Sequence, residues 1–224
     1  MSTDLNALLI RKDLVADAIR QWILHGKFNP GDKLDQQQVA DELAVSRSPV
    51  REALRALEAE GLITLIPNRG AIVTERTLAE LEELYFTRGI VEGIAIERAT
   101  PHLGPPTVRR LAEILEAADR TDDYGELLML DNDFHMLTYQ DYPQPFLIDY
   151  IQQLRNMAAP YNRLYYDSEG SRETAWNEHR RIYEACLRRD AALARDEVRR
   201  HLNGVIRKIA DAVGNRPALL LEPA

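Results

Sequence analysis

The chain of 224 residues is poor in cysteine and contains no hydrophobic run of membrane-spanning length. Its one cysteine, Cys186, cannot form a disulfide within the chain, which is typical of proteins in a reducing cytosol. Residues 1–9 lack the positively charged start and the apolar stretch of a signal peptide. The sequence therefore predicts a cytoplasmic protein without a membrane partner, and a hydrophobic content of 45% is sufficient for buried cores.

The chain also lacks an excess of positive charge, since its formal net charge is -8. Residues 1–76 hold 10 Lys and Arg against 11 Asp and Glu, a net charge of -1, whereas residues 77–224 hold 18 against 25, a net charge of -7. The acidic excess therefore belongs to the second half of the chain. In the nearly neutral first half, the placement of arginine can decide where DNA docks, although non-specific affinity should be modest.

Residues 45–55 predict a short helix with two unlike faces. Ser46 or Ser48 can cap its N-terminus, and a proline at position 49 is tolerated in a first turn, where its missing N–H would have no helical partner. Three arginines recur every fourth residue and share one face, opposite an apolar face that can pack: Arg47, Arg51 and Arg55. A solvated amphipathic surface helix would carry the same pattern, so the flanking segments decide between the two interpretations.

The flanking segments predict a winged helix-turn-helix. The further helices are expected at residues 10–26 and 35–43, and two short strands at residues 62–66 and 71–74. The second helix extends through Leu43, and only Ala44 and Val45 separate it from the capping serine of the arginine helix, which is a helix-turn-helix spacing. Gly61 can end the arginine helix, and the turn between the two strands puts Arg69 and Gly70 at the tip of the wing.

A set of residues in this segment resembles the DNA-binding domain of GntR-family bacterial transcription regulators. The set comprises Gly31, Leu34, Val39, Ala40, Leu43, residues 45–54, Leu57, Glu58, residues 60–62, Arg69 and Gly70. The resemblance implies that Arg47 and Arg51 contact bases and phosphates and that Gly70 approaches the minor groove. The residues predicted to bind DNA are Gln37, Arg47, Ser48, Arg51, Arg55, Arg69 and Gly70.

Two positions depart from the pattern of that family. Gln37 stands where many members have a base-reading arginine, and Ala44 replaces a common turn glycine. The operator sequence is therefore expected to differ from the familiar ones.

Beyond residue 76 the strand pattern ends and helical periodicity continues to about residue 215. Helices are predicted at residues 77–100, 105–120, 123–140, 144–165, 171–189 and 191–213, with proline, glycine or aspartate between most of them. The sequence thus predicts a mainly α protein: a winged helix-turn-helix domain at residues 1–76, an all-α six-helix bundle at residues 77–215 and a loose tail at residues 216–224.

Three histidines of the predicted bundle indicate a metal site. Asp131 and His135 are four residues apart and share one face of a helix. His179 and His201 lie on the last two helices, at similar distances from the tight turn that joins them, so they should sit at similar heights. Three imidazoles and one carboxylate suit a divalent transition metal. Singly, each histidine is more typical of a surface or hydrogen-bonded residue.

These positions, with their order and spacing, resemble the signature of the FCD ligand-binding domain of FadR-like GntR regulators, and six helices resemble the VanR-like branch. The resemblance implies that Asp131, His135, His179 and His201 hold a divalent metal, with Zn as the first candidate and Ni or Mn as alternatives, and that a small carboxylic acid completes its coordination. Gln144, after a proline, departs from a common Gly-Asn pair, so the start of that helix is expected to be reshaped.

An acidic effector needs cationic partners in the same domain. Arg88 and Glu92 match a recurrent Arg-x-x-x-Glu of the family and are predicted to bind the effector, with Arg155 as a weaker candidate. A guanidinium group fits a carboxylate well. The alternative is an ion pair within or between helices.

The sequence therefore predicts a homodimeric, ligand-responsive transcription repressor that binds a palindromic DNA operator and is not an enzyme. One alternative is the same regulator with a purely structural metal and a different effector. A second is a metal-dependent hydrolase, because a three-histidine site with an open position can activate water. Against the hydrolase, the chain has no His-Glu-x-x-His motif, and Glu178, the nearest candidate base, is adjacent to a predicted ligand.

Overall fold

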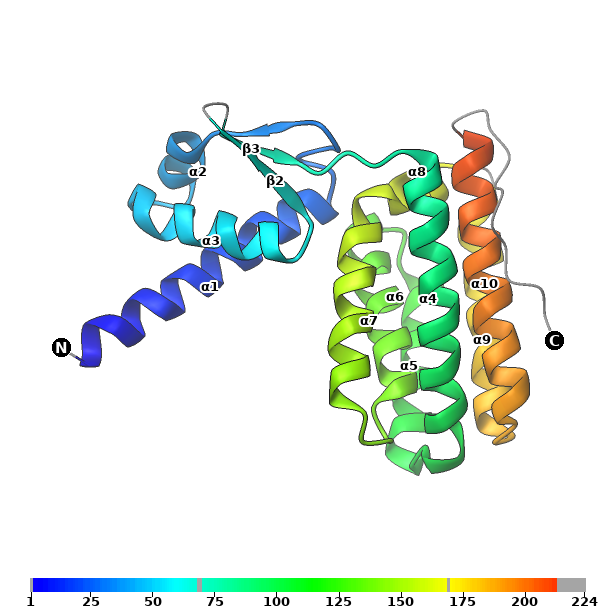
Figure 1. The fold of residues 1–224 in the computed structure, drawn as a ribbon. Helices are drawn as coiled ribbons and strands as arrows, with labels where there is room; N and C mark the ends of the chain where they lie inside the picture. The colour runs from blue at the N-terminus through cyan, green and yellow to red at the C-terminus, as the bar shows by residue number, and fades with distance from the viewer. Residues whose placement is uncertain (1, 68–69, 169, 213–224) are drawn as a thin grey trace. The chain divides into compact units, whose positions relative to one another are not determined.

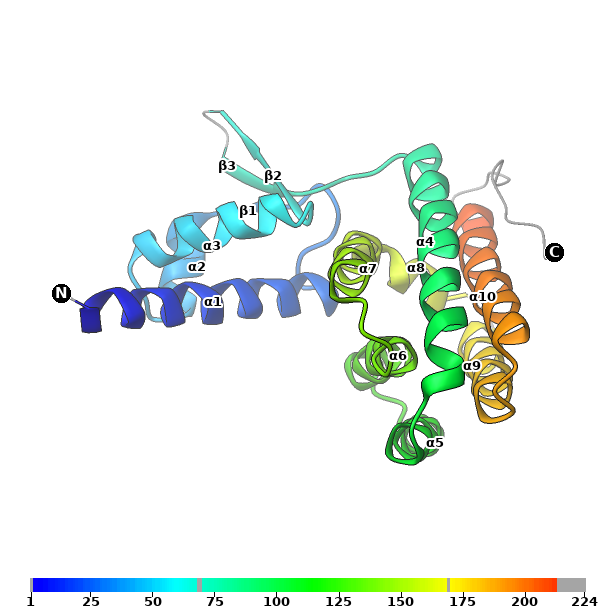
Figure 2. The same cartoon turned by 60° about the horizontal axis from the view of Figure 1, so that its bottom comes forward.

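The computed structural model describes residues 2–67, 70–168 and 170–212, with residues 2–12 described in their backbone only. The chain divides into two compact units, Met1–Arg76 and Thr77–Ala224. Figures 1 and 2 show the elements of each unit from two directions. Arg69, predicted at the tip of the wing, and the predicted tail at residues 216–224 lie outside the described residues.

The first unit is a winged helix-turn-helix, as predicted. Its elements are α1 (Ser2–Leu24), β1 (Lys33–Leu34), α2 (Gln36–Glu42), α3 (Arg47–Ala59), β2 (Ile63–Ile66) and β3 (Gly70–Val73). The strands form an antiparallel sheet in the order β1-β3-β2, with Thr64 opposite Ile72. The carboxylate of Asp35 caps α2 by accepting hydrogen bonds from the backbone N–H groups of Gln37 and Gln38, at 2.8 Å and 3.0 Å.

The sequence patterns missed two features of this unit. The β1 strand is only two residues long, which is too short to show an alternating pattern. The first helix begins at Ser2 rather than at residue 10. At the turn between α2 and α3, Ala44 has a φ of 51° in the left-handed region, where a glycine would be unstrained.

The apolar faces of α1 and α3 form much of the core of the first unit, together with buried residues of α2 and the three strands. Side chains under 2% exposed include Ile19, Ile23, Val50, Leu54 and Leu57. The opposite face of α3, which carries the arginines, is exposed. The helix therefore divides its two faces between packing and solvent, as the pattern of residues 45–55 predicts.

The second unit is an all-helical bundle, as predicted. Its α-helices are α4 (Leu78–Ala99), α5 (Pro105–Arg120), α6 (Tyr124–Tyr139), α7 (Pro145–Ala158), α8 (Asn162–Tyr166), α9 (Ser171–Leu187) and α10 (Ala191–Ala212), with 3-10 turns η1 (Thr100–His102) and η2 (Ala159–Tyr161). The prediction of one continuous helix at residues 144–165 was wrong. Pro160 lies between α7 and α8, and a proline both lacks an N–H and disfavours helical geometry in the residue before it.

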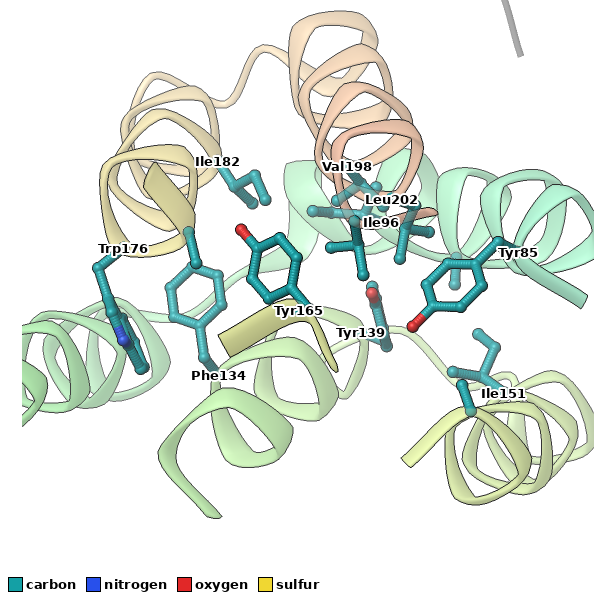
Figure 3. Close-up of a cluster of buried hydrophobic side chains, with 14 of the residues drawn as sticks. Tyr85, Ile96, Phe134, Tyr139, Ile151, Tyr165, Trp176, Ile182, Val198 and Leu202 are labelled. Carbon is teal, nitrogen blue, oxygen red and sulfur yellow. The ribbon is translucent and has the colours of Figure 1, made fainter. Parts of the chain in front are cut away.

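The α4 and α10 helices lie side by side, with α9 next to α10 (Figures 1 and 2). Aromatic rings from three other positions of the bundle join its core: Figure 3 shows Phe134 and Tyr139 from α6, Tyr165 from α8 and Trp176 from α9 among aliphatic side chains. Each of these rings is buried. Among the described residues, no helix combines the length and the apolar character needed to cross a bilayer.

Candidate DNA interface and metal centre

The arginines of α3 form the first candidate site. The side chains of Arg51 and Arg55 are 58% and 62% exposed, and both lie near Glu52, at nitrogen–oxygen distances of 3.8 Å and 3.3 Å. Exposed ion pairs of this kind contribute little to stability, so a phosphate can replace the carboxylate at low cost. Arg47 and Ser48 are exposed at the N-terminal end of the same helix.

Two shallow grooves bring α3 together with the wing and with α2. One is lined by Gln36, Arg51, Leu54, Arg55, Leu65, Ile66, Pro67 and Gly70. The other is lined by Lys33, Leu34, Asp35, Gln36, Gln37, Arg47 and Gly70. Five of the seven residues predicted to bind DNA therefore line these grooves. Ser48 is exposed beside them on α3, and Arg69 lies outside the described residues.

Gly70 begins β3 with a φ of 91°, a conformation that favours glycine. An added Cβ there would lie 3.6 Å from Cε of Lys33 on β1. Lys33 thus joins the groove that contains Arg47, and it is a cationic residue that the sequence analysis missed. No periodic signal marks it, because its strand is so short.

The second candidate site is a cluster of four side chains from α6, α9 and α10. One ligand atom from each of Asp131, His135, His179 and His201 can be chosen so that all four lie within 4.8 Å of one another. Nε2 of His179 is 3.1 Å from Nε2 of His135 and 3.5 Å from Oδ1 of Asp131. The three imidazoles are buried. The structure thus brings together all four residues that the sequence predicts as metal ligands.

Two imidazoles of this cluster, those of His135 and His179, are suited to hold a cation as neutral ligands. Burial, and then the positive charge of Arg155 and of neighbouring histidines, holds the pKa of His135 well below its ordinary value. Burial and neighbouring positive charge also hold the pKa of His179 well below that value. Two neutral nitrogens 3.1 Å apart, beside a carboxylate, form the nitrogen and oxygen donor set that suits zinc and other divalent transition metals.

The predicted effector residues form a buried ionic network next to the cluster. Nε of Arg88 donates to Glu92 at 2.7 Å, so the two residues form the ion pair within a helix that is the alternative to effector binding. Nη1 of Arg155 is 3.4 Å from Glu92, and its Nη2 donates to Oδ2 of Asp131 at 2.8 Å. Burial alone would raise the pKa of Glu92, but Arg88 and Arg155 outweigh it and the pKa is lowered. Arg155 thus links Glu92 to the candidate metal ligand Asp131.

Tyr139 supports this network in a way that the sequence did not specify. Its O–H donates to Oε2 of Glu92 at 2.8 Å, and its oxygen lies 3.3 Å from Nδ1 of His135. The only sequence signal is that Tyr139 follows His135 by four residues.

Gln144, which departs from the family pattern, stands at the N-terminus of α7, where its side-chain N–H donates to the backbone oxygen of Ala95 at 3.2 Å.

A winged helix with an exposed arginine face, joined to a helical bundle that holds three histidines and an aspartate, defines a two-domain DNA-binding regulator. Comparison with protein families agrees. Residues 11–73 match the family of bacterial regulatory proteins called the gntR family, and residues 83–204 match the FCD domain. The chain belongs to the gntR family, carries an FCD domain and is a DNA-binding transcription regulator.

Relatives along most of the chain are regulators of the same class. The HTH-type transcriptional repressor RspR of Escherichia coli is 27% identical, over 95% of this chain and 93% of its own length. The uncharacterized regulator YdhC of Bacillus subtilis is 28% identical, over 83% of this chain and 84% of its own length. A solved structure of a putative GntR regulator from Rhodococcus sp. RHA1 is 26% identical, with a TM-score of 0.77 over 91% of this chain and 98% of that one. Escherichia coli McbR/YncC has the same fold, with a TM-score of 0.76 over 86% and 93% at 23% identity.

Proposed function

We propose that the protein is a homodimeric transcription repressor of the cytoplasm that binds a palindromic operator and releases it in response to a small carboxylic acid held at a divalent metal. The observation that carries this proposal is the cluster of Asp131 with the buried histidines His135, His179 and His201, beside two buried arginines. Zinc is the first candidate, and nickel or manganese are alternatives. The similar protein RspR is named a transcriptional repressor, which supports the direction of control.

Each winged domain would bind one half of the operator. Arg47, Arg51 and Arg55 lie on the exposed face of α3, and Gln37 and Gly70 line the same grooves. Ser48 and Arg69 are proposed as further contacts from the helix start and the wing. Dimeric regulators of this kind read two half-sites related by the symmetry of the dimer.

Charge balance favours an anionic effector. Asp131 and Glu92 offset Arg88 and Arg155 in the buried network, so a divalent cation would add positive charge that these residues do not offset. Such a cation, when bound, offers Lewis-acidic positions to a carboxylate. Arg88 and Arg155 would orient the acid. The guanidinium group of Arg155, which donates to Asp131, would then contact both Asp131 and the acid. The acid controls DNA binding only if its affinity differs between the operator-binding and the operator-free states.

The melting temperature of the full-length protein tests this proposal. The protein is stripped of metal, reloaded with zinc, and titrated with a panel of small carboxylic acids, with His135→Ala as the control. Stabilisation by one acid that requires both zinc and His135 is the expected result, because a ligand that binds only the folded state raises its stability. Stabilisation by the same acid in the stripped protein or in the variant would contradict a metal-bound effector.

A structural metal is the second candidate function of the cluster. Full burial of the three histidines favours it, since closed sites are typical of structural metals. In that case zinc alone would raise the melting temperature and no acid would add to it. The hydrolase alternative is less favoured, because the Glu178 carboxylate, the nearest candidate base, is hydrogen-bonded to His201 at 2.9 Å.

A further inference from the structure

Glu178 on α9 lies against α10 at the outer side of the histidine cluster. Its Oε2 is 2.9 Å from Nδ1 of His201. An ionised carboxylate can only accept hydrogen bonds, so Nδ1 of His201 must carry the proton. A neutral imidazole protonated at Nδ1 has its lone pair at Nε2, the nitrogen that remains for the cluster.

The surroundings of Glu178 hold this carboxylate in place. Its side chain is only 12% exposed, and its oxygens would lie 3.6 Å and 3.7 Å from a Cβ added at Gly204, so it packs against the backbone of α10. Nη2 of Arg181, one turn further along α9, is 3.5 Å from Oε1. Nε of Arg181 also donates to Glu197 on α10 at 3.2 Å. A mostly buried carboxylate with a cation beside one oxygen and an imidazole nitrogen beside the other has a defined orientation.

We propose that Glu178 is a positioning residue of the metal centre: it fixes His201 in the tautomer protonated at Nδ1 and directs Nε2 toward Asp131, His135 and His179. This inference rests on the proposed metal centre. A carboxylate behind a metal-binding histidine orients the ring and raises the basicity of the ligating nitrogen. Glu178 itself lies on the far side of the His201 ring and is not a ligand.

The three histidines differ in what stands behind them. His135 has the neutral hydroxyl of Tyr139 at 3.3 Å from Nδ1, and that hydroxyl is itself bonded to Glu92. Within the described part of the chain, Nδ1 of His179 has no hydrogen-bond partner. Among the three histidines as the structure describes them, only His201 therefore has a carboxylate as the hydrogen-bond acceptor of its Nδ1. Removal of that carboxylate should free the orientation and the tautomer of the His201 ring.

A purely structural role for Glu178 makes a different prediction. If Glu178 acted only through its ion pair with Arg181, then Arg181→Gln would have the same effect as loss of the carboxylate. Arg181→Gln removes the ion pairs to both Glu178 and Glu197 but leaves the Glu178–His201 hydrogen bond. It is therefore the matched control.

Zinc affinity of the full-length protein, measured by competition with a chromogenic chelator, tests the inference. Glu178→Ala should bind zinc roughly 10–100-fold more weakly than the parent protein, the usual effect of removing an outer partner of a metal ligand. Glu178→Gln, which keeps an oxygen acceptor without the charge, should show a smaller loss. Arg181→Gln should bind zinc as the parent does.

Nitrogen NMR of the metal-free protein reports the tautomer of His201, which a general loss of stability would not change. His201 should be protonated at Nδ1 in the parent and in Arg181→Gln, and should show a mixed or reversed tautomer in Glu178→Ala. Unchanged zinc affinity and an unchanged tautomer in Glu178→Ala would overturn the inference and leave the metal centre standing. If Glu178→Ala does not fold, Glu178→Gln decides by the same two criteria. A parent protein that binds no zinc would overturn both proposals.

Discussion

Glu92 is the buried carboxylate that connects the predicted effector residues Arg88 and Arg155 with Tyr139, which lies beside the candidate metal ligand His135. It is fully buried and accepts hydrogen bonds from Arg88 and Tyr139, and Arg155 approaches it from α7. Buried charges are stable only when they are paired and hydrogen-bonded. Each member of this network therefore depends on the others, and removal of one leaves a charge uncompensated.

Replacing Glu92 by alanine should destabilise the protein strongly, because two buried guanidinium groups would lose their carboxylate. Loss of one partner of a buried ion pair costs roughly 3–5 kcal/mol. Urea unfolding followed by circular dichroism measures the change. Glu116→Ala is the control, since Glu116 pairs with Arg120 and both side chains are 70% exposed, and it should cost less than about 1 kcal/mol. Small, equal losses in both variants would contradict the buried network.

Acid should destabilise the metal-free protein through His135 and His179. The pKa of each is held well below the ordinary value of 6.5, first of all by burial. Below about pH 6.5 the unfolded chain binds protons that the folded chain does not, so the free energy of unfolding decreases as the pH falls. Above that pH both states are neutral at these residues and the contribution vanishes. Melting temperatures in a chelator from about pH 8 to pH 5 measure the effect, and a flat profile would count against it.

At the scale of elements, α3 and the wing act as one surface. The helix supplies an exposed row of arginines, and the strand that begins at Gly70 borders the same two grooves. Sequence periodicity was sufficient to predict α3, because its apolar residues are buried and its arginines are exposed. The groove that contains Arg47 is also lined by Lys33 and Leu34 of β1, and no sequence pattern predicted this strand.

Replacing Arg51 by alanine should strongly weaken specific operator binding and leave the oligomeric state unchanged. One bidentate contact between arginine and a base is worth roughly 1–3 kcal/mol of discrimination. Fluorescence anisotropy with a selected operator duplex measures the affinity, and size-exclusion chromatography measures the oligomeric state. Arg110→Ala on α5, which removes an exposed arginine of the other unit, is the control and should bind as the parent does. Unchanged affinity in Arg51→Ala would remove α3 from the recognition role.

The candidate metal site was predictable because its ligands obey two simple rules of helices. Asp131 and His135 are one turn apart, and His179 and His201 are at similar distances from a tight turn. The contacts behind them were not predictable. The Arg155–Asp131 and Tyr139–Glu92 hydrogen bonds join different helices, and their formation depends on side-chain rotamers that periodicity does not specify. The break between α7 and α8, in contrast, was predictable, because Pro160 is visible in the sequence and proline interrupts a helix.

At the scale of the molecule, the two candidate sites belong to different units. The DNA-binding face lies in Met1–Arg76 and the histidine cluster lies in Thr77–Ala224. Control of transcription by an acid at the metal therefore requires that binding in one unit alters the operator affinity of the other. Such coupling is a property of the full-length chain and has the same magnitude in both directions.

The decisive measurement is the operator affinity of the full-length, zinc-loaded protein with and without the acid identified by thermal stabilisation. We predict that the acid weakens operator binding by the parent protein and has no effect on the metal-stripped protein or on His135→Ala. An operator affinity that the acid leaves unchanged in the zinc-loaded parent, under conditions where the acid is bound, would contradict the account.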